Sequence, residues 1–173
     1  MKMNIISLIG FSGSGKTHFI VQAIELLQAS LNIKIACIKN VHQHDVDVKG
    51  KDSFKFMRAG ATYSIIKNQH KDHAIFVRHD FEIHEIIDWV SKGPLKLDLI
   101  FIEGFRNLSF PTILCVKEYN EIAEQFSNKV RMISGVLTSK SNYPNDYKGI
   151  PIKNLKKDFT EFLNIFDIQT KDN

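Results

Sequence analysis

Short apolar runs alternate along this chain with segments in which apolar residues recur at helical spacing. The first run, Asn4–Ile9, is followed by an apolar stripe that extends from Phe19 to Leu31. This spacing places the stripe on one face of a helix that starts near Lys16. The next apolar run, residues 33–38, predicts a second strand. The chain therefore opens with a strand–helix–strand unit, which predicts a parallel pair with a right-handed crossover.

The remaining pattern predicts a mostly parallel sheet with helices on both faces. The run at 97–102 is nearly all apolar, which is typical of a strand buried on both sides. Further strands are expected at 62–67, 74–78, 113–116 and 130–137, and further helices at 52–58, 83–90, 118–126 and around 155–166. The strands at 62–67 and 74–78 are joined by a polar turn, so we expect an antiparallel hairpin that makes the sheet mixed. The whole predicts one three-layer α/β domain over residues 1–173.

Composition and charge narrow the class of protein. The chain has 173 residues, of which 43% are apolar and 24% charged, as in an ordinary globular domain. Lys and Arg exceed Asp and Glu by 23 − 19 = 4. This excess favours phosphorylated ligands but is too small to indicate a nucleic-acid binder. We find neither a signal-peptide pattern nor an apolar run near the roughly 18 residues of a membrane span, so we expect a cytoplasmic protein.

A glycine-rich segment follows the first strand and opens the first helix. It fits the P-loop pattern of Gly, four residues, Gly-Lys-Ser/Thr, in which backbone N–H groups surround phosphate oxygens. The positive end of the helix adds to this attraction. Lys16 would reach the β- and γ-phosphates as a catalytic residue, and the Thr17 hydroxyl would bind Mg²⁺. The predicted nucleotide-binding residues are Gly10, Ser12, Gly13, Ser14, Gly15, Lys16 and Thr17. The pattern predicts a P-loop NTPase fold, and Phe11, in place of a second lysine, argues against partitioning-type ATPases.

A P-loop needs an acid at the end of a neighbouring strand to hold Mg²⁺ or to orient water. Glu103 ends the buried run at 98–102 and would emerge at the carboxyl edge, where open α/β sheets bind ligands. We therefore expect Glu103 to be a catalytic residue and a Mg²⁺ ligand. Asp45, Asp47 and Asp52 lie in the loop after the second strand, which should reach the same edge. We predict Asp47 as the further Mg²⁺ ligand, and Asp52 is alternatively the cap of a short helix.

The chain resembles the MobB family, the molybdopterin-guanine dinucleotide biosynthesis proteins B. Its middle segments carry more of this resemblance than the P-loop alone, because Gly-Lys-Asp-Ser followed by Ala-Gly-Ala is a specific combination. The matching segments are Gly10–Thr17, Ile38 and Lys39 with Asp47, residues 50–53, residues 59–61 and residues 98–106. The chain departs from the family at Asn40, where His is usual, and at Lys49, where Pro is usual. Roles that depend on that histidine are therefore not transferred to Asn40.

The resemblance implies a homodimeric GTP-binding protein with weak GTPase activity and Mg²⁺ as cofactor. Such a protein assists the molybdenum cofactor guanylyltransferase that joins GMP to molybdopterin, and molybdopterin itself is a further possible ligand. Weak hydrolysis agrees with the residues, since no obvious arginine finger or water-orienting glutamine stands beside the P-loop, and Arg58 and Arg106 are the candidates that stay open for this role. The segment Leu137–Lys140 is a candidate contact for the base, although it lacks the Asn-Lys-x-Asp pattern of guanine recognition.

Two other classes of function use the same phosphate loop. A small-molecule kinase of the dethiobiotin-synthetase type would use ATP, and it shares the Glu-Gly pair found here at Glu103 and Gly104. A nickel metallochaperone GTPase would find support in His42 and His44, although two histidines in a loop without cysteine more often face solvent. Preference for ATP would favour the kinase, and stoichiometric nickel binding would favour the metallochaperone.

Overall fold

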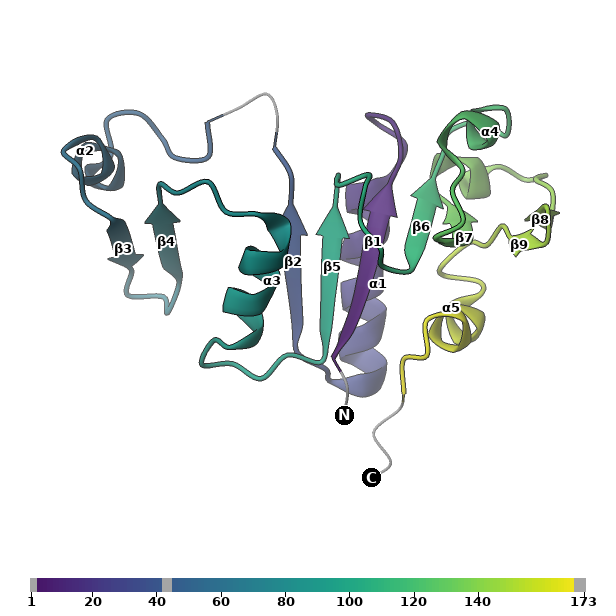
Figure 1. Ribbon diagram of the computed structural model, residues 1–173. Helices are drawn as coiled ribbons and strands as arrows, with labels where there is room; N and C mark the ends of the chain where they lie inside the picture. The colour runs from purple at the N-terminus through teal and green to yellow at the C-terminus, as the bar shows by residue number, and fades with distance from the viewer. Residues whose placement is uncertain (1–2, 42–44, 170–173) are drawn as a thin grey trace. The chain divides into compact units, whose positions relative to one another are not determined.

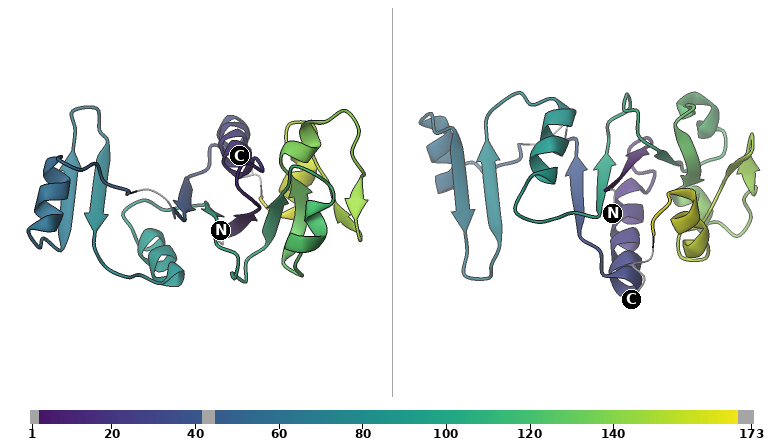
Figure 2. Two further views of the ribbon diagram at one scale, coloured as in Figure 1. Left: turned by 90° about the horizontal axis from the view of Figure 1, so that it is seen from above. Right: turned by 60° about the horizontal axis from the view of Figure 1, so that its bottom comes forward.

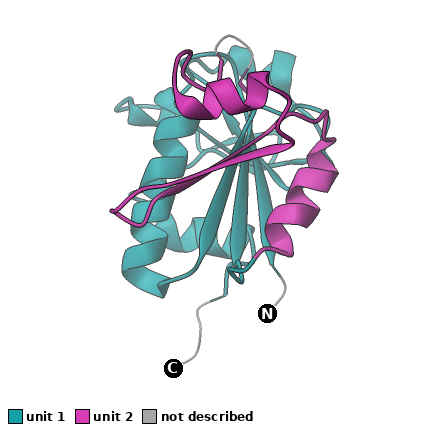
Figure 3. Ribbon diagram, turned by 90° about the vertical axis from the view of Figure 1, so that its left-hand side faces the viewer, with its two compact units in different colours: residues 1–40, 94–173 teal, residues 41–93 magenta. Residues whose placement is uncertain are grey.

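The structure, a computed structural model, describes residues 3–41 and 45–169, which divide into two compact units. The described parts of 1–40 and 94–173 form unit 1, coloured teal in Figure 3, and those of 41–93 form unit 2, coloured magenta. The expectation of one domain over residues 1–173 stays a prediction. Within the described ranges, no helix is long and apolar enough to cross a membrane.

Unit 1 is built on a five-stranded sheet in which every strand pair is parallel (Figure 1). The strand order is β2-β5-β1-β6-β7. The strands are β1 (Asn4–Ile9), β2 (Ile35–Lys39), β5 (Leu99–Glu103), β6 (Thr112–Cys115) and β7 (Val130–Ser134). The other elements of unit 1 are α1 (Lys16–Leu31), α4 (Glu121–Gln125), the 3₁₀ helix η1 (Val136–Ser139), the short pair β8 (Asp146–Tyr147) and β9 (Ile150–Pro151), and α5 (Phe159–Ile165).

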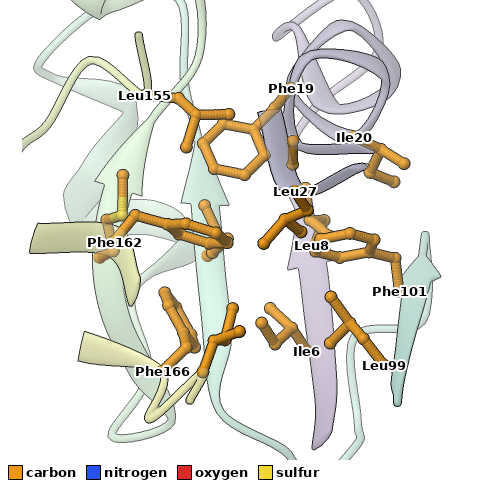
Figure 4. Close-up of a cluster of buried hydrophobic side chains, with 14 of the residues drawn as sticks. Ile6, Leu8, Phe19, Ile20, Leu27, Leu99, Phe101, Leu155, Phe162 and Phe166 are labelled. Atoms are coloured by element: carbon orange, nitrogen blue, oxygen red, sulfur yellow. The ribbon is translucent and has the colours of Figure 1, made fainter. Parts of the chain in front are cut away.

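The two faces of this sheet carry separate apolar clusters, because successive strand residues point to opposite sides. On one face, Ile6 and Leu8 of β1 pack with the buried stripe of α1 and with Phe162 of α5 (Figure 4). The rings of Phe19 and Phe162 meet edge to face with their centroids 5.9 Å apart. Figure 2 shows α1 lying lengthwise along the strands. On the other face, Ile9 packs in a cluster that includes Ile122 of α4. Unit 1 thus has helices on both faces of its sheet, as predicted.

The register of the strands brings their carboxyl ends to one edge. Glu103, at the end of β5, is paired with Leu8 of β1 on one side and with Lys39 of β2 on the other. All five residues of β5 are buried, so this interior strand is covered on both faces. β2 and β6 lie on opposite sides of β1, so the order in which the strands are added reverses direction beside β1. Open α/β sheets bind ligands at such a switch point, at the carboxyl ends of the strands.

Unit 2 contains α2 (Asp52–Arg58), β3 (Tyr63–Lys67), β4 (His73–Val77) and α3 (Ile83–Ser91). The predicted hairpin is confirmed, since β3 and β4 pair antiparallel. The expectation that it joins the main sheet is wrong, because β3 and β4 form a sheet of their own. Most of their side chains are exposed, unlike the apolar residues of a strand buried between two layers.

One predicted strand is shorter than expected. The run at 130–137 was expected to be a single strand, but β7 ends at Ser134 and η1 follows. Gly135 has φ 96° and turns the chain there. The backbone N–H of Val136 then donates to the carbonyl of Ser14 at 3.1 Å, so this turn packs directly against the glycine-rich segment.

Candidate nucleotide-binding site

The glycine-rich segment forms a tight loop between β1 and α1. Gly10 has φ 149°, and a Cβ at this position would lie 2.2 Å from the carbonyl oxygen of Cys115. Only glycine fits so close to the neighbouring strand. Ser12 and Gly13 are exposed, whereas Ser14 is buried and its hydroxyl has no hydrogen-bond partner among the described residues. Gly15, with φ 95°, directly precedes the first turn of α1, which carries Lys16 and Thr17.

The side chain of Lys16 folds back over the loop. Its Nζ donates to the carbonyl oxygens of Gly10 at 2.9 Å and Phe11 at 3.0 Å. Burial lowers the pKa of Lys16 below its ordinary value, and the nearby Glu103 carboxylate partly opposes that shift. The ammonium group therefore lies over the loop, at the position from which a P-loop lysine contacts phosphate oxygens.

Thr17 and Glu103 meet at the edge of the sheet. The Thr17 hydroxyl lies 3.0 Å from each carboxylate oxygen of Glu103, whose side chain is 9% exposed. A hydroxyl and one carboxylate are ligands that suit Mg²⁺, which usually binds to one or two carboxylates together with phosphate oxygens and water. Among residues 3–41 and 45–169, no group of three or more His, Cys, Asp or Glu could hold a metal by itself. The residues therefore fit a Mg²⁺ ion that is bound jointly with a phosphate.

Asp47 lies in unit 2, where its carboxylate makes local contacts. Its Oδ1 accepts hydrogen bonds from the backbone N–H of Val48 at 2.8 Å and from the Ser53 hydroxyl at 2.9 Å. Its Oδ2 is buried without a partner in the part of the chain that the structure describes. The Mg²⁺ role of Asp47 stays a prediction. Asp52 is the first residue of α2, whose N-cap is Lys51, so Asp52 is not the cap, and its carboxylate pairs with Lys55 at 3.1 Å. His42 and His44 lie outside the described residues.

Three further cations surround the loop. The sequence left Arg106 open as an arginine finger and gave no role in the site to the other two. Lys39 forms an ion pair with Glu103 at 3.2 Å. The Arg106 guanidinium lies 5.4 Å from the centre of the Phe11 ring and donates to the Gln125 side chain at 3.2 Å. Lys117 lies against Gly13, since a Cβ on that glycine would be 3.2 Å from its Nζ. Lys39 follows the apolar run at 33–38 in the sequence. The rule that parallel strands end at the same edge of a sheet could have placed this lysine near the site, although not in contact with Glu103.

A cavity of about 160 Å³ lies beside the P-loop within unit 1. Gly15, His18 and Gln22 line it from α1 and its start, and Thr138 and Ser139 line it from η1. Asn154 closes another side, and its Nδ2 donates to the Thr138 carbonyl at 2.9 Å. Part of the predicted base-contact segment Leu137–Lys140 therefore reaches this cavity, whereas Leu137 is buried and Lys140 pairs with Glu118.

The parallel sheet, the loop at its switch point and the Lys16, Thr17 and Glu103 cluster define an α/β protein of the P-loop NTPase class. A family model described as molybdopterin guanine dinucleotide synthesis protein B, MobB, matches residues 5–139. The chain belongs to this MobB family, and the resemblance noted in the sequence is confirmed.

Individual relatives agree with this assignment, and a solved structure shares the fold. A protein from Escherichia coli, named molybdopterin-guanine dinucleotide biosynthesis adapter protein, is 31% identical over 116 residues, which cover 66% of each chain. A relative from Methanocaldococcus jannaschii is 31% identical over 121 residues, or 67% of this chain and 48% of that protein. The chain thus spans about half the length of that relative. The crystal structure of Bacillus subtilis MobB has the same fold, with a TM-score of 0.77 at 20% identity, covering 98% of this chain and all of that one.

Proposed function

We propose that this protein is a GTP-binding adapter that assists the attachment of GMP to molybdopterin during molybdenum cofactor biosynthesis. The observation that carries the proposal is the contact of Thr17 with Glu103 beside a loop over which the Lys16 ammonium lies. The family match and the name of the E. coli relative support the biosynthetic role. A cytoplasmic location fits this role.

Different residues of unit 1 would hold different parts of a bound triphosphate and its Mg²⁺. The N–H groups of Gly13, Gly15 and their neighbours bind phosphate oxygens, and Lys16 neutralises the β- and γ-phosphates. Thr17 and Glu103 hold Mg²⁺, which neutralises phosphate charge when it is bound. Hydrolysis is weak, because the Arg106 guanidinium is already engaged by the Phe11 ring and Gln125. The assignment of Asp47 as a further Mg²⁺ ligand is part of this proposal.

The guanine base occupies the cavity beside Gly15. Two observations support this placement. The cavity adjoins the loop that would hold the phosphates, and its walls present hydroxyl and amide groups from Ser139 and Gln22. Polar groups of this kind can recognise the edge of a purine through hydrogen bonds.

The decisive test is calorimetric titration with non-hydrolysable GTP and ATP analogues in the presence of Mg²⁺. Tighter binding of the guanine analogue is expected and would direct attention to the guanylyltransferase partner. Tighter binding of the adenine analogue would keep the phosphate site but overturn the adapter function in favour of a kinase. Binding of neither analogue would remove the proposed nucleotide site.

The second copy of a homodimer pairs with the hairpin of unit 2. Tyr63, Ile65 and Ile75 are at least half exposed, and the cross-strand pairing puts them on one face of the hairpin. A lone two-stranded sheet is marginally stable in water, and its open edges invite pairing with another chain. Ile65→Lys places a charge on this face and should shift the protein to monomers in sedimentation analysis, whereas Val21→Lys, at an exposed position of α1, should not. A monomeric wild-type protein, or equal behaviour of both variants, would contradict this interface.

A further inference from the structure

Lys39 lies where the metal ligands meet. Its Nζ is 3.2 Å from the Thr17 hydroxyl and 3.2 Å from Oε1 of Glu103. Thr17 and Glu103 are themselves 3.0 Å apart, so the three side chains form a closed triangle. The two oxygens that Lys39 contacts are the same oxygens that this site offers to Mg²⁺.

The backbone fixes Lys39 in this position. In the parallel pairing of β2 with β5, Lys39 stands directly opposite Glu103. The backbone N–H of the next residue, Asn40, donates to the Glu103 carbonyl at 2.9 Å and continues the same register. Neighbouring strands are about 4.8 Å apart, so two side chains in register on one face reach each other without strain. The ion pair therefore follows from the sheet and does not depend on a loop conformation.

Electrostatics explains why a cation is needed here. The Glu103 side chain is almost buried, and a buried carboxylate is costly unless an opposite charge or hydrogen bonds compensate it. Lys16 directs hydrogen bonds to the carbonyls of Gly10 and Phe11 instead. Among the described residues, Lys39 forms the ion pair with this carboxylate, and it compensates the charge together with the Thr17 hydroxyl and the nearby Lys16.

Mg²⁺ and the Lys39 ammonium would compete for these oxygens. Mg²⁺ binds oxygen at about 2.0–2.1 Å in a strict octahedron, and two cations at one carboxylate would repel each other. The Lys39 side chain is 52% exposed, so its ammonium can move into water while the buried strands stay in place.

We propose that Lys39 is a resident cation at the metal position, which holds Thr17 and Glu103 in place and competes with Mg²⁺ for them. Lys39 is thus a positioning residue that sets the Mg²⁺ concentration at which the site binds the metal. The proposal rests on the nucleotide-binding function, because that function assigns Thr17 and Glu103 to Mg²⁺.

The first experiment needs no nucleotide and uses pyrophosphate instead, because Mg²⁺ would bind here together with phosphate oxygens. The melting temperature of the full chain is measured at a fixed pyrophosphate concentration over a range of Mg²⁺ concentrations for the wild type, Lys39→Met and Lys34→Met. Lys34 is an exposed lysine just before β2, so its replacement makes the same change in net charge. The Mg²⁺ concentration at the midpoint of the melting-temperature response should be roughly twofold to fivefold lower for Lys39→Met than for the wild type. This range corresponds to the loss of one exposed ion pair. Lys34→Met should match the wild type.

Further variants keep this test decisive. Adding Glu103→Gln to Lys39→Met should abolish the Mg²⁺ response, which locates the effect at this carboxylate. Lys39→Gln gives the same comparison if the methionine variant does not fold. A Mg²⁺ midpoint in the Lys39 variants that equals or exceeds that of the wild type, or no response to Mg²⁺ in them, would overturn the proposal.

A second experiment separates this inference from the proposed function. Binding of a fluorescent GTP analogue is followed during Mg²⁺ titration, with the same variants at the same nucleotide concentration. The half-saturating Mg²⁺ concentration should fall in Lys39→Met by a similar factor and stay constant in Lys34→Met. A shift to higher Mg²⁺ would overturn the role of Lys39 while leaving nucleotide binding intact. Failure of the wild type to bind the analogue would instead refute the proposed function, and the nucleotide-free measurement would still decide the role of Lys39.

Discussion

In unit 1, all five residues of β5 are buried, whereas in unit 2 the paired strands β3 and β4 leave Tyr63, Ile65 and Ile75 at least half exposed. The phosphate loop directly follows β1, and Glu103 is the last residue of β5. Their positions are set by a core with little freedom to adjust, since protein interiors are close-packed. Asp47 belongs to the second kind of region, where hydrogen bonds rather than a deep core fix the side chain. The comparison shows which candidate site residues are built into the fold.

Truncating one core residue in each unit should give the largest difference. Phe101→Ala in β5 should destabilise the protein by roughly 3–5 kcal/mol, because Phe101 is fully buried and its loss leaves a cavity. Ile65→Ala in β3 should change the stability by about 0.5 kcal/mol or less, as is usual at an exposed position. Urea unfolding at low protein concentration measures both. Similar losses for the two variants would mean that the units do not differ in this way.

Two glycines with positive φ, Gly10 and Gly60, offer a comparison of crowded and open surroundings. Gly10→Ala should cost roughly 3 kcal/mol or more, because the new Cβ would strike the carbonyl of Cys115 as well as strain the backbone. Gly60→Ala in unit 2, with φ 102°, should cost only about 1–2 kcal/mol, because nothing lies within 4 Å of its Cβ position. Urea unfolding gives both values. Equal costs would show that the close approach at Gly10 is not tight.

The Mg²⁺ role of Asp47 can be tested against that of Asp45 in the same loop. Asp47→Asn should weaken the Mg²⁺ dependence of nucleotide binding more than Asp45→Asn does. It should also destabilise the protein by about 1 kcal/mol, because a neutral amide accepts less strongly from Ser53 and Val48. The reverse order would assign the metal contact to Asp45. Lower stability with unchanged Mg²⁺ dependence would leave Asp47 a purely local role in unit 2.

The smallest effect is a dependence on alkaline pH. Burial lowers the pKa of Lys16, so its ammonium loses the proton at a lower pH than an ordinary lysine. Triphosphate affinity should therefore fall as the pH rises, and this fall should begin below the ordinary lysine value of 10.5. Over the same range, the free energy of unfolding should rise slightly, because the unfolded chain then binds more protons. Lys16→Arg, which stays charged, should bind triphosphate with a flat pH profile. A fall of the same size in Lys16→Arg would assign the effect to another group.

Much of unit 1 could be predicted from the sequence because its signals are local. The apolar run before Glu103 and the apolar stripe of α1 each predict their own element, and the P-loop pattern fixes the role of the segment between β1 and α1. Thr17 and Glu103 were both assigned to the metal site. Their meeting at 3.0 Å agrees with the rule that parallel strands end at one edge.

The features that sequence did not predict depend on pairing across distance. The contact of Lys39 with Glu103 requires the register of β2 against β5, and a single sequence does not specify that register. Arg106 lies over Phe11 because two loops meet in space. The hairpin was predicted correctly, but its failure to join the main sheet depends on which strand edges meet, and the apolar pattern of β3 and β4 does not encode this.

The central claim is that the loop from Gly10 to Thr17 binds a triphosphate through Lys16. Calorimetric titration of a non-hydrolysable GTP analogue with Mg²⁺, into the wild type, Lys16→Ala and Lys34→Ala, tests it most directly. Lys16→Ala should lose roughly 2 kcal/mol or more of binding free energy, as expected for a charge-assisted contact, whereas Lys34→Ala should bind like the wild type. Unchanged affinity in a folded Lys16→Ala protein would contradict the site and the function proposed from it.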